Sequence, residues 1–197
     1  MSKRGLEKLY LKDGFSVMQI ANKFSVSQHK INYWLSKYNI QKRTISEAMY
    51  LKLNPNGDPF CYQAPRNKAE WILFGLGIGL FWGEGNKRSK SSVRLGNTDP
   101  RLVRTFLSFL DKIFRVNRTK LRFGLQIFSD ISSEVAKKYW EKKLNIPSSQ
   151  FYKVTITPAR NIGTYKYKSE YGVLTVHFAN TKLKKAIDKL IENSPPV

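Results

Sequence analysis

A glycine-rich apolar run constrains the fold of this chain more than any other feature of its sequence. The run is WILFGLGIGLFWGEGNK, residues 71–87, and a single carboxylate stands near its end. Read as a helix that begins near residue 69, it places three glycines four residues apart on one face: Gly75, Gly79 and Gly83. Each glycine costs a helix about 1 kcal/mol relative to alanine. We therefore expect a second helix to approach this face closely, since no Cβ atom blocks it.

Two other interpretations of the run were considered. A buried core helix that ends by chance on Glu84 fits the same pattern, and the sequence leaves this alternative open. A membrane span is not expected, because only 13 residues separate Glu70 from Glu84 and a span needs about 20 apolar residues.

The end of the run resembles a known family motif. Residues 79–85, GLFWGEG, are similar to the LAGLIDADG motif of homing endonucleases and of DNA-binding proteins derived from them. The alignment places Gly79 at the internal glycine of the motif and Glu84 at its second acid. Trp82 occupies the position of the motif's first acid, and residues 77–78 occupy the positions of its opening Leu-Ala. The second acid binds the catalytic metal in that family, so the resemblance implies that Glu84 is a catalytic residue and a Mg²⁺ ligand.

The charge of the chain indicates a polyanionic partner. Its 35 Lys and Arg residues against 14 Asp and Glu residues give a net charge of +21. Residues 1–60 carry +6 of this charge and the remainder carries +15. Because 41% of the residues are hydrophobic, we expect a folded protein that binds nucleic acid and not a basic tail. A basic protein that is merely soluble, or one bound to an anionic membrane surface, is the alternative.

The compartment is expected to be reducing. Cys61 is the only cysteine, which excludes a disulfide framework and a zinc site built from cysteines. The first residues, MSKRGLEKLY, contain no apolar signal core. We therefore expect a cytoplasmic protein that associates with the nucleoid when it is bound to DNA.

The first forty residues predict three short helices. Ser16 can cap a helix whose inward positions are residues 17, 20, 21 and 24, and Ser27 can cap the helix that follows a tight turn. This pattern is similar to the helix-turn-helix of resolvases and transposases. An ordinary three-helix bundle with a solvated polar face is the alternative. The outward residues at the start of the third helix would contact DNA: Gln28, His29, Lys30, Asn32 and Tyr33.

Composition divides the chain into three parts. We expect a helix-turn-helix domain over residues 1–45, a linker over 46–67 and a LAGLIDADG-like domain over 68–197. The linker holds the segment NPNGDPFCYQAP, in which three prolines and a glycine disfavour regular structure.

The third part predicts an α+β fold. Its elements read helix, strand, helix, strand, helix, strand, strand, helix, which favours a mainly antiparallel sheet. The segment LRFGLQIF, residues 121–128, alternates apolar and polar residues, as does each of the later segments FYKVTITP and YGVLTVHFA. The LAGLIDADG core has two strand pairs and flanking helices that form a saddle over DNA. The helix over 133–144 is extra to that order.

The polar sides of these strands, and the basic and aromatic loop between the last two, are the expected DNA contacts of the saddle. They are Arg94, Arg122, Gln126, Lys153, Thr155, Arg160, Tyr165, Lys166, Lys168 and His177.

The resemblance implies a mechanism. One chain has one motif, so a nuclease of this family would be a homodimer through Gly75, Gly79 and Gly83, in which each subunit supplies Glu84 to a Mg²⁺ site. Gln126 is the candidate for ordering water and Lys87 for stabilising charge, although Lys87 also fits a solvated lysine.

Three function classes stay open. The first is a site-specific endonuclease that hydrolyses duplex DNA, and the second is a DNA-binding transcription regulator that has lost catalysis. The third is an RNA-binding, maturase-like role. Other enzymes are poorly supported, because the chain has two histidines and no phosphate-cradling glycine loop.

Overall fold

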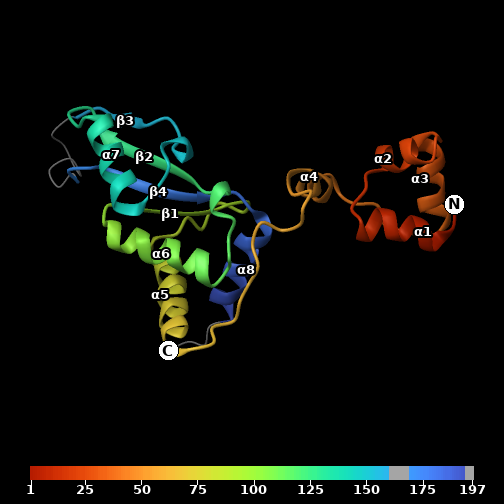
Figure 1. Cartoon of the computed structure of the whole chain (residues 1–197), viewed down its shortest axis with the longest axis horizontal. Helices are drawn as coiled ribbons and strands as arrows, with labels where there is room; N and C mark the ends of the chain where they lie inside the picture. The colour runs from red at the N-terminus through yellow and green to blue at the C-terminus, as the bar shows by residue number, and fades with distance from the viewer. Residues whose placement is uncertain (160–168, 194–197) are drawn as a thin grey trace. The chain divides into compact units, whose positions relative to one another are not determined.

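The computed structural model describes residues 1–159 and 169–193. The chain divides into two compact units, Met1–Pro59 and Phe60–Val197. Figure 1 shows the first unit in red and orange and the second in yellow to blue. The division falls within residues 46–67, the stretch expected to be a linker. Each unit is described by itself below.

All the described secondary structure of the first unit is helical. Helix α1 (Lys3–Glu7) continues into a π-helical turn, η1 (Lys8–Lys12). Helices α2 (Val17–Lys23), α3 (Gln28–Lys37) and α4 (Ile45–Leu53) follow. Ser16 and Ser27 cap α2 and α3 as predicted, since their hydroxyls accept hydrogen bonds from the third residue of each helix. The buried core residues of this unit are Leu6, Tyr10, Ile20, Ala21, Ile31, Leu35 and Ile40.

The turn between α2 and α3 corrects one prediction. Phe24, expected to point inward four residues after Ile20, is 45% exposed. Helix α2 ends at Lys23, and Phe24 is its C-cap with non-helical backbone angles, so its side chain does not continue the buried face. Ser25 then takes a left-handed conformation with φ of 50°, which reverses the chain sharply.

Arg43 binds the segment between α3 and α4 to the core of this unit. Its guanidinium lies 4.0 Å from the centre of the Tyr10 ring and donates hydrogen bonds to the carbonyl oxygens of Gly14 (3.0 Å), Phe15 (2.6 Å) and Tyr10. Arg43 therefore has a structural role in this unit.

The second unit has the predicted element order. Its helices are α5 (Lys68–Glu84), α6 (Pro100–Lys112), α7 (Ser133–Leu144) and α8 (Thr181–Glu192), with short 3-10 turns η2 (Arg118–Lys120) and η3 (Ser148–Gln150). Its strands are β1 (Val93–Asn97), β2 (Arg122–Phe128), β3 (Thr155–Thr157) and β4 (Val173–Phe178). The unit is therefore α+β.

The sheet is mixed. Its strand order is β1-β4-β2-β3, and β4 runs antiparallel to both of its neighbours while β3 runs parallel to β2. The chain passes through α7 between β2 and β3, and such a crossover allows consecutive strands to pair in parallel. Strands β3 and β4 are consecutive in the sequence but are not neighbours, so the expected two pairs of strands are replaced by one continuous sheet.

Strand β3 is shorter than the segment FYKVTITP suggested. Lys153 precedes it, and Ile156 is 57% exposed. Strand β3 lies at the edge of the sheet, where an apolar side chain such as Ile156 can stay uncovered by a helix.

One face of the sheet forms the core. Leu95, Phe123, Leu125, Leu174 and Val176 point from β1, β2 and β4 into a cluster with residues of the four helices. On α7 the buried stripe is narrower than predicted, because Ala136, Trp140 and Leu144 are buried while Val135 is 57% exposed. The opposite face of the sheet carries polar side chains.

Segment 60–67 belongs to this unit and is not a free linker. The backbone amides of Cys61 and Gln63 donate to the carbonyl oxygens of Phe114 and Ile113, each over 2.7 Å. Asn67 then caps α5, since its side chain accepts a hydrogen bond of 2.9 Å from the amide of Glu70.

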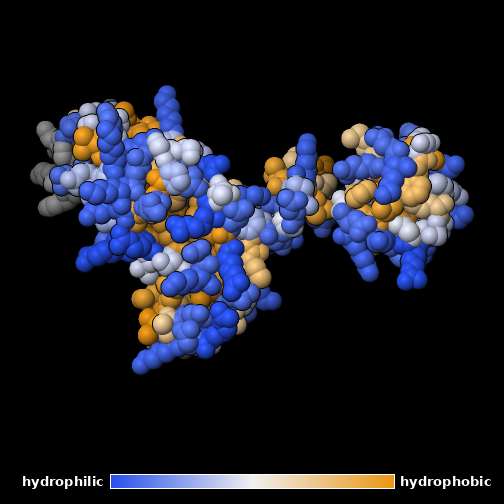
Figure 2. All heavy atoms as spheres, in the orientation of Figure 1, coloured by the Kyte–Doolittle hydropathy of each residue, from blue (hydrophilic) through white to orange (hydrophobic). Residues whose placement is uncertain are grey.

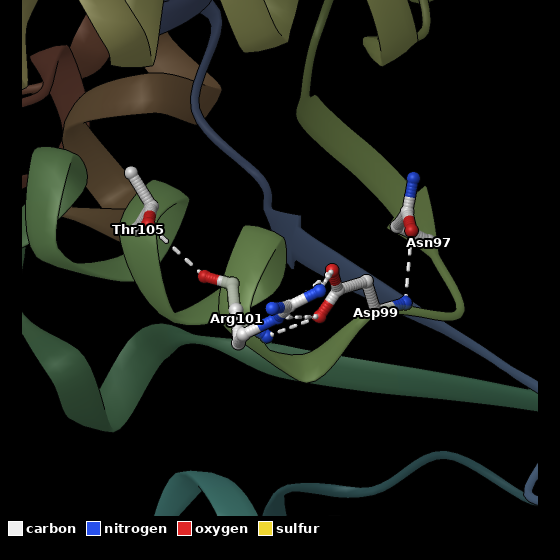
Figure 3. A network of polar contacts seen from close by, with 4 residues as sticks. All are labelled: Asn97, Asp99, Arg101 and Thr105. Atoms are coloured by element: carbon white, nitrogen blue, oxygen red, sulfur yellow. Dashed lines mark hydrogen bonds and ion pairs between the residues drawn. The ribbon is translucent and has the colours of Figure 1, made fainter.

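A compact polar network begins α6 (Figure 3). Asn97 accepts from the amide of Asp99, and Asp99 accepts from both the backbone amide and the guanidinium of Arg101. The side-chain hydrogen bond from Arg101 lowers the pKa of Asp99, with the backbone amide of Arg101 as the second cause. The Thr105 hydroxyl donates to the Arg101 carbonyl over 3.0 Å. This network starts α6 directly after β1, with Pro100 in its first turn.

Candidate functional site

The polar face of the sheet is arranged in rows across the strands. Arg94 of β1 pairs with His177 of β4, and His177 pairs with Arg122 of β2. Paired residues on neighbouring strands share a face and lie about 5 Å apart. Three predicted DNA-binding residues from distant parts of the sequence therefore form one basic row.

The adjacent row is formed by Gly96, Thr175 and Gly124 in the same strand order. A Cβ atom at Gly96 would lie 2.9 Å from the Thr175 hydroxyl oxygen, and one at Gly124 would lie 3.3 Å from Nε2 of His177. The two glycines therefore leave room for the side chains of β4, which would otherwise be crowded from both sides.

An open hollow of about 500 Å³ lies beside these rows. Its lining comes from the end of α5, from the loop after it, and from strands β1 and β4, and consists of Glu84, Asn86, Arg88, Arg94, Gly96, Thr175 and His177. The structure thus brings Glu84 together with two of the predicted DNA-binding residues. Asn86, Arg88, Gly96 and Thr175 were not among the predicted site residues. Asn86 and Arg88 follow the motif in the loop after α5, whereas Gly96 and Thr175 join the hollow through strand pairing.

The end of α5 is held against β1. The amide of Gly85 donates to the Phe81 carbonyl over 2.9 Å, and the amide of Asn86 donates to the Arg94 carbonyl over 2.9 Å. A Cβ atom at Gly85 would lie 2.3 Å from the Phe81 carbonyl oxygen, so glycine is required there. This close turn ends the helix as predicted and places Glu84 at the hollow.

Arg94 is oriented by its own loop. Its Nε donates to the Ser92 hydroxyl over 2.8 Å, and that hydroxyl lies 2.7 Å from the hydroxyl of Ser89. Ser92 is 4% exposed. The guanidinium is therefore fixed through Nε, and its terminal nitrogens have no hydrogen bond to another described residue.

His177 is half-buried at the hollow. Its ring meets Tyr152 edge-on, with ring centres 5.4 Å apart. Burial lowers the pKa of His177 and the charge of Arg94 lowers it further. The imidazole is therefore neutral at pH 7.

One chain does not form a metal site by itself. Glu84 is exposed and is the only carboxylate among the described residues that line the hollow. Throughout residues 1–159 and 169–193, there is no group of three or more His, Cys, Asp or Glu side chains that could hold a metal ion. The donors next to Glu84 are mainly cationic or amide groups, which do not fit Mg²⁺.

Other predicted site residues lie outside the hollow. Gln126 donates a hydrogen bond of 3.2 Å to the Thr157 hydroxyl, on the β3 side of the sheet. Lys87, Lys153 and Thr155 are exposed. Arg160, Tyr165, Lys166 and Lys168 lie outside the described residues.

In the first unit, α3 presents the predicted recognition residues. Gln28, His29, Lys30 and Tyr33 are exposed, and Asn32 is partly exposed. The Lys30 ammonium lies 5.5 Å from the centre of the Trp34 ring, so its stem follows the helix surface.

The outer side of α5 is apolar and uncovered. A Cβ atom at Gly75, Gly79 or Gly83 would meet nothing within 4 Å. Four large exposed side chains lie on the same side, within about 140° of the helical wheel: Trp71 (58% exposed), Ile72 (53%), Leu76 (52%) and Trp82 (60%). We call these seven residues the open face of α5. Figure 2 shows hydrophobic spheres gathered over this helix.

Comparison with known proteins gives no match to a family model, to a curated protein or to a solved structure. Among the described residues, no helix is both long enough and apolar enough to cross a membrane.

Proposed function

We propose that this protein is a DNA-binding homodimer that hydrolyses phosphodiester bonds in duplex DNA with Mg²⁺, on a LAGLIDADG-like fold. One observation carries the proposal: α5 has an uncovered apolar face with three glycines, and the same helix ends on Glu84 at a basic hollow of the sheet. A buried core helix that ends by chance on an acid would not leave this face open.

The open face of α5 suits a second copy of the same helix. Its apolar side chains would leave water on association, and its glycines would allow two backbones to approach closely. A two-fold axis that runs parallel to α5, beside its open face, would bring the two copies of this face into contact. The same axis places both Glu84 carboxylates at the same end of the helix pair.

Two Glu84 carboxylates would supply the acidic ligands that one chain lacks. These two carboxylates are the residues that would hold Mg²⁺ in the dimer, and the ion would supply Lewis-acid chemistry to the hydrolysis. Arg88 and Arg94, which line the hollow with Glu84, would bind the phosphate charge. The predicted catalytic roles of Gln126 and Lys87 stay predictions, since neither side chain lines the hollow.

The polar face of the sheet and the exposed side of α3 would contact DNA. The basic row of Arg94, His177 and Arg122 is suited to backbone phosphates, while α3 carries groups able to hydrogen-bond base edges. Binding should weaken steeply with salt, because neutralised phosphates release counterions. An affinity for duplex DNA that does not change with salt would contradict this interface.

Cleavage of a randomised duplex library with Mg²⁺ tests the function directly. The wild-type protein should cut the library, and Glu84→Gln should bind it without cutting, because the amide keeps the shape and removes the ligand charge. Glu134→Gln is the matched control, since it makes the same change at an exposed carboxylate of α7 that does not line the hollow. Equal cutting by wild type and Glu84→Gln would remove Glu84 from the mechanism.

A transcription regulator is the second candidate, and the surroundings of Glu84 favour it. Two arginines and a neutral histidine line the hollow beside a single acid, which suits phosphate binding without metal. Sequence-selective binding by both proteins and cutting by neither would establish this candidate. Tighter binding to RNA than to duplex DNA would instead support the maturase-like role.

A further inference from the structure

The imidazole of His177 is an unused hydrogen-bonding group in a polar hollow. Neither of its nitrogens has a hydrogen bond to a residue in the described part of the chain. The ring has space because β2 carries a glycine beside it: a Cβ atom at Gly124 would lie only 3.3 Å from Nε2. The edge-on contact with Tyr152 limits its movement on the other side.

The hollow around His177 collects hydrogen-bond donors. Asn86 uses its side-chain oxygen to accept from the Ser89 amide over 3.0 Å, which leaves its NH₂ group to donate. Arg94 is held through Nε by Ser92, so its terminal NH₂ groups can also donate. The Thr175 hydroxyl and Arg88 complete the lining. Such a set matches a phosphate group, whose oxygens are acceptors.

The charges that face His177 come from every element beside it. Arg94 on β1 and Arg122 on β2 flank it in register, Arg88 lies in the loop after α5, and Glu84 is at the end of α5. Tyr152, from the segment before β3, is the other titratable neighbour. Burial and the charge of Arg94 disfavour a positive charge on the ring while the hollow holds only water. A phosphate would reverse this balance by adding negative charge next to the ring.

We propose that the hollow is a seat for one backbone phosphate of the bound DNA, and that His177 holds this phosphate as an imidazolium. On binding, one proton passes from solvent to the free imidazole nitrogen, and no other bond forms or breaks. The inference rests on the proposed binding of DNA and adds the ligand chemistry of this hollow. It does not require that the protein cleaves DNA.

The proposal predicts proton-linked binding. Between the pKa of His177 in the free protein and its higher pKa in the complex, the affinity should fall by up to tenfold for each unit of increase in pH. Below and above that interval the titration of His177 should cause no further change of affinity with pH.

The affinity for a short duplex is measured by fluorescence anisotropy at constant salt from about pH 5.5 to 8, the range in which histidines titrate. Wild type should show the fall, and His177→Gln should bind with no pH dependence in this range. Lys112→Gln is the control, because Lys112 is exposed on α6 and lies outside the hollow and the proposed DNA contacts. Lys112→Gln should retain the fall. A fall that persists in His177→Gln would overturn the proposal.

A second measurement uses the wild-type protein and inorganic phosphate as the probe. NMR titration of the His177 ring should give a higher pKa with phosphate than with chloride at equal ionic strength. Equal pKa values with phosphate and chloride would overturn the seat even if the protein binds DNA.

The two measurements separate failure of this inference from failure of the proposed function. DNA binding without any effect at His177 would retain the function and remove the seat. A phosphate-dependent pKa of His177 in a protein that binds no duplex would retain the seat and remove the function.

Discussion

The two sides of α5 differ in what their glycines do. On the inner side, Gly77 lies against α6, and a Cβ atom there would be 2.1 Å from the Phe109 ring. On the outer side, Gly75, Gly79 and Gly83 face open space. The inner glycine is needed for the chain to fold, whereas the outer glycines have no role within one chain.

This difference shows what a glycine pattern can reveal. The spacing of four residues indicated a glycine stripe on one side of the helix, and an exposed apolar face of this kind signals a partner outside the chain. Gly77 was seen only as a departure from a motif, although it is the glycine that the fold requires. Glycine in a helix therefore marks close approach, but its neighbours in space decide whether the partner is internal.

The largest expected effect is at Gly77. The substitution Gly77→Val should lower the free energy of unfolding of the second unit by about 3 kcal/mol or more, because Phe109 is fully buried and cannot move aside. Urea unfolding followed by the fluorescence of Trp140, which is also fully buried, measures the change. An unchanged unfolding midpoint would show that the two sides of α5 do not differ.

A smaller effect, with a different readout, is expected at Gly79. Gly79→Leu should leave the second unit folded, and replacing glycine inside a helix adds up to about 1 kcal/mol of stability. Self-association should weaken at least about tenfold, a loss of about 1.4 kcal/mol, because the side chain separates the two helices. Sedimentation velocity measures it, with Lys112→Leu, on the exposed surface of α6, as the control for added apolar area. An unchanged dimer, or a wild-type monomer even with DNA, would remove the open face from the proposal.

The smallest expected effect is at Lys184, a buried lysine on α8 that contacts Phe81 on the inner side of α5. Its ammonium lies 5.5 Å from the centre of the Phe81 ring and 2.5 Å from Asp188. Lys184→Met keeps the apolar stem against Phe81, and Asp188 is 37% exposed, so water can solvate it. The free energy of unfolding should change by less than about 1 kcal/mol. A loss of several kcal/mol in urea unfolding would show that the charge of Lys184, and not only the packing of its stem on Phe81, stabilises α8 against α5.

Much of the local structure could be predicted. The caps Ser16 and Ser27, the end of α5 at Glu84 and the alternation along β2 all depend on neighbours within four residues. The errors at Phe24 and Val135 arose where a helix had ended or its buried stripe was narrow. Periodicity indicates which residues share a face, but not how many of them another element covers.

The candidate site was predicted in part. Glu84, Arg94 and His177 were chosen from a motif and from alternation, and they line one hollow. Asn86, Gly96 and Thr175 were not singled out as site residues. The contribution of Gly96 and Thr175 depends on the pairing of β1 with β4, which are separated by about eighty residues.

The sequence by itself determined the order of elements, the two-part division and the excess of basic charge, because these follow from local periodicity and composition. Only the tertiary structure decided that β4 lies between β1 and β2, that β3 runs parallel to β2, and that Gly77 faces inward while Gly79 faces outward. Strand order and helix burial depend on contacts between residues far apart in the chain. Such contacts are set by how the elements fill one core together, which no local pattern encodes.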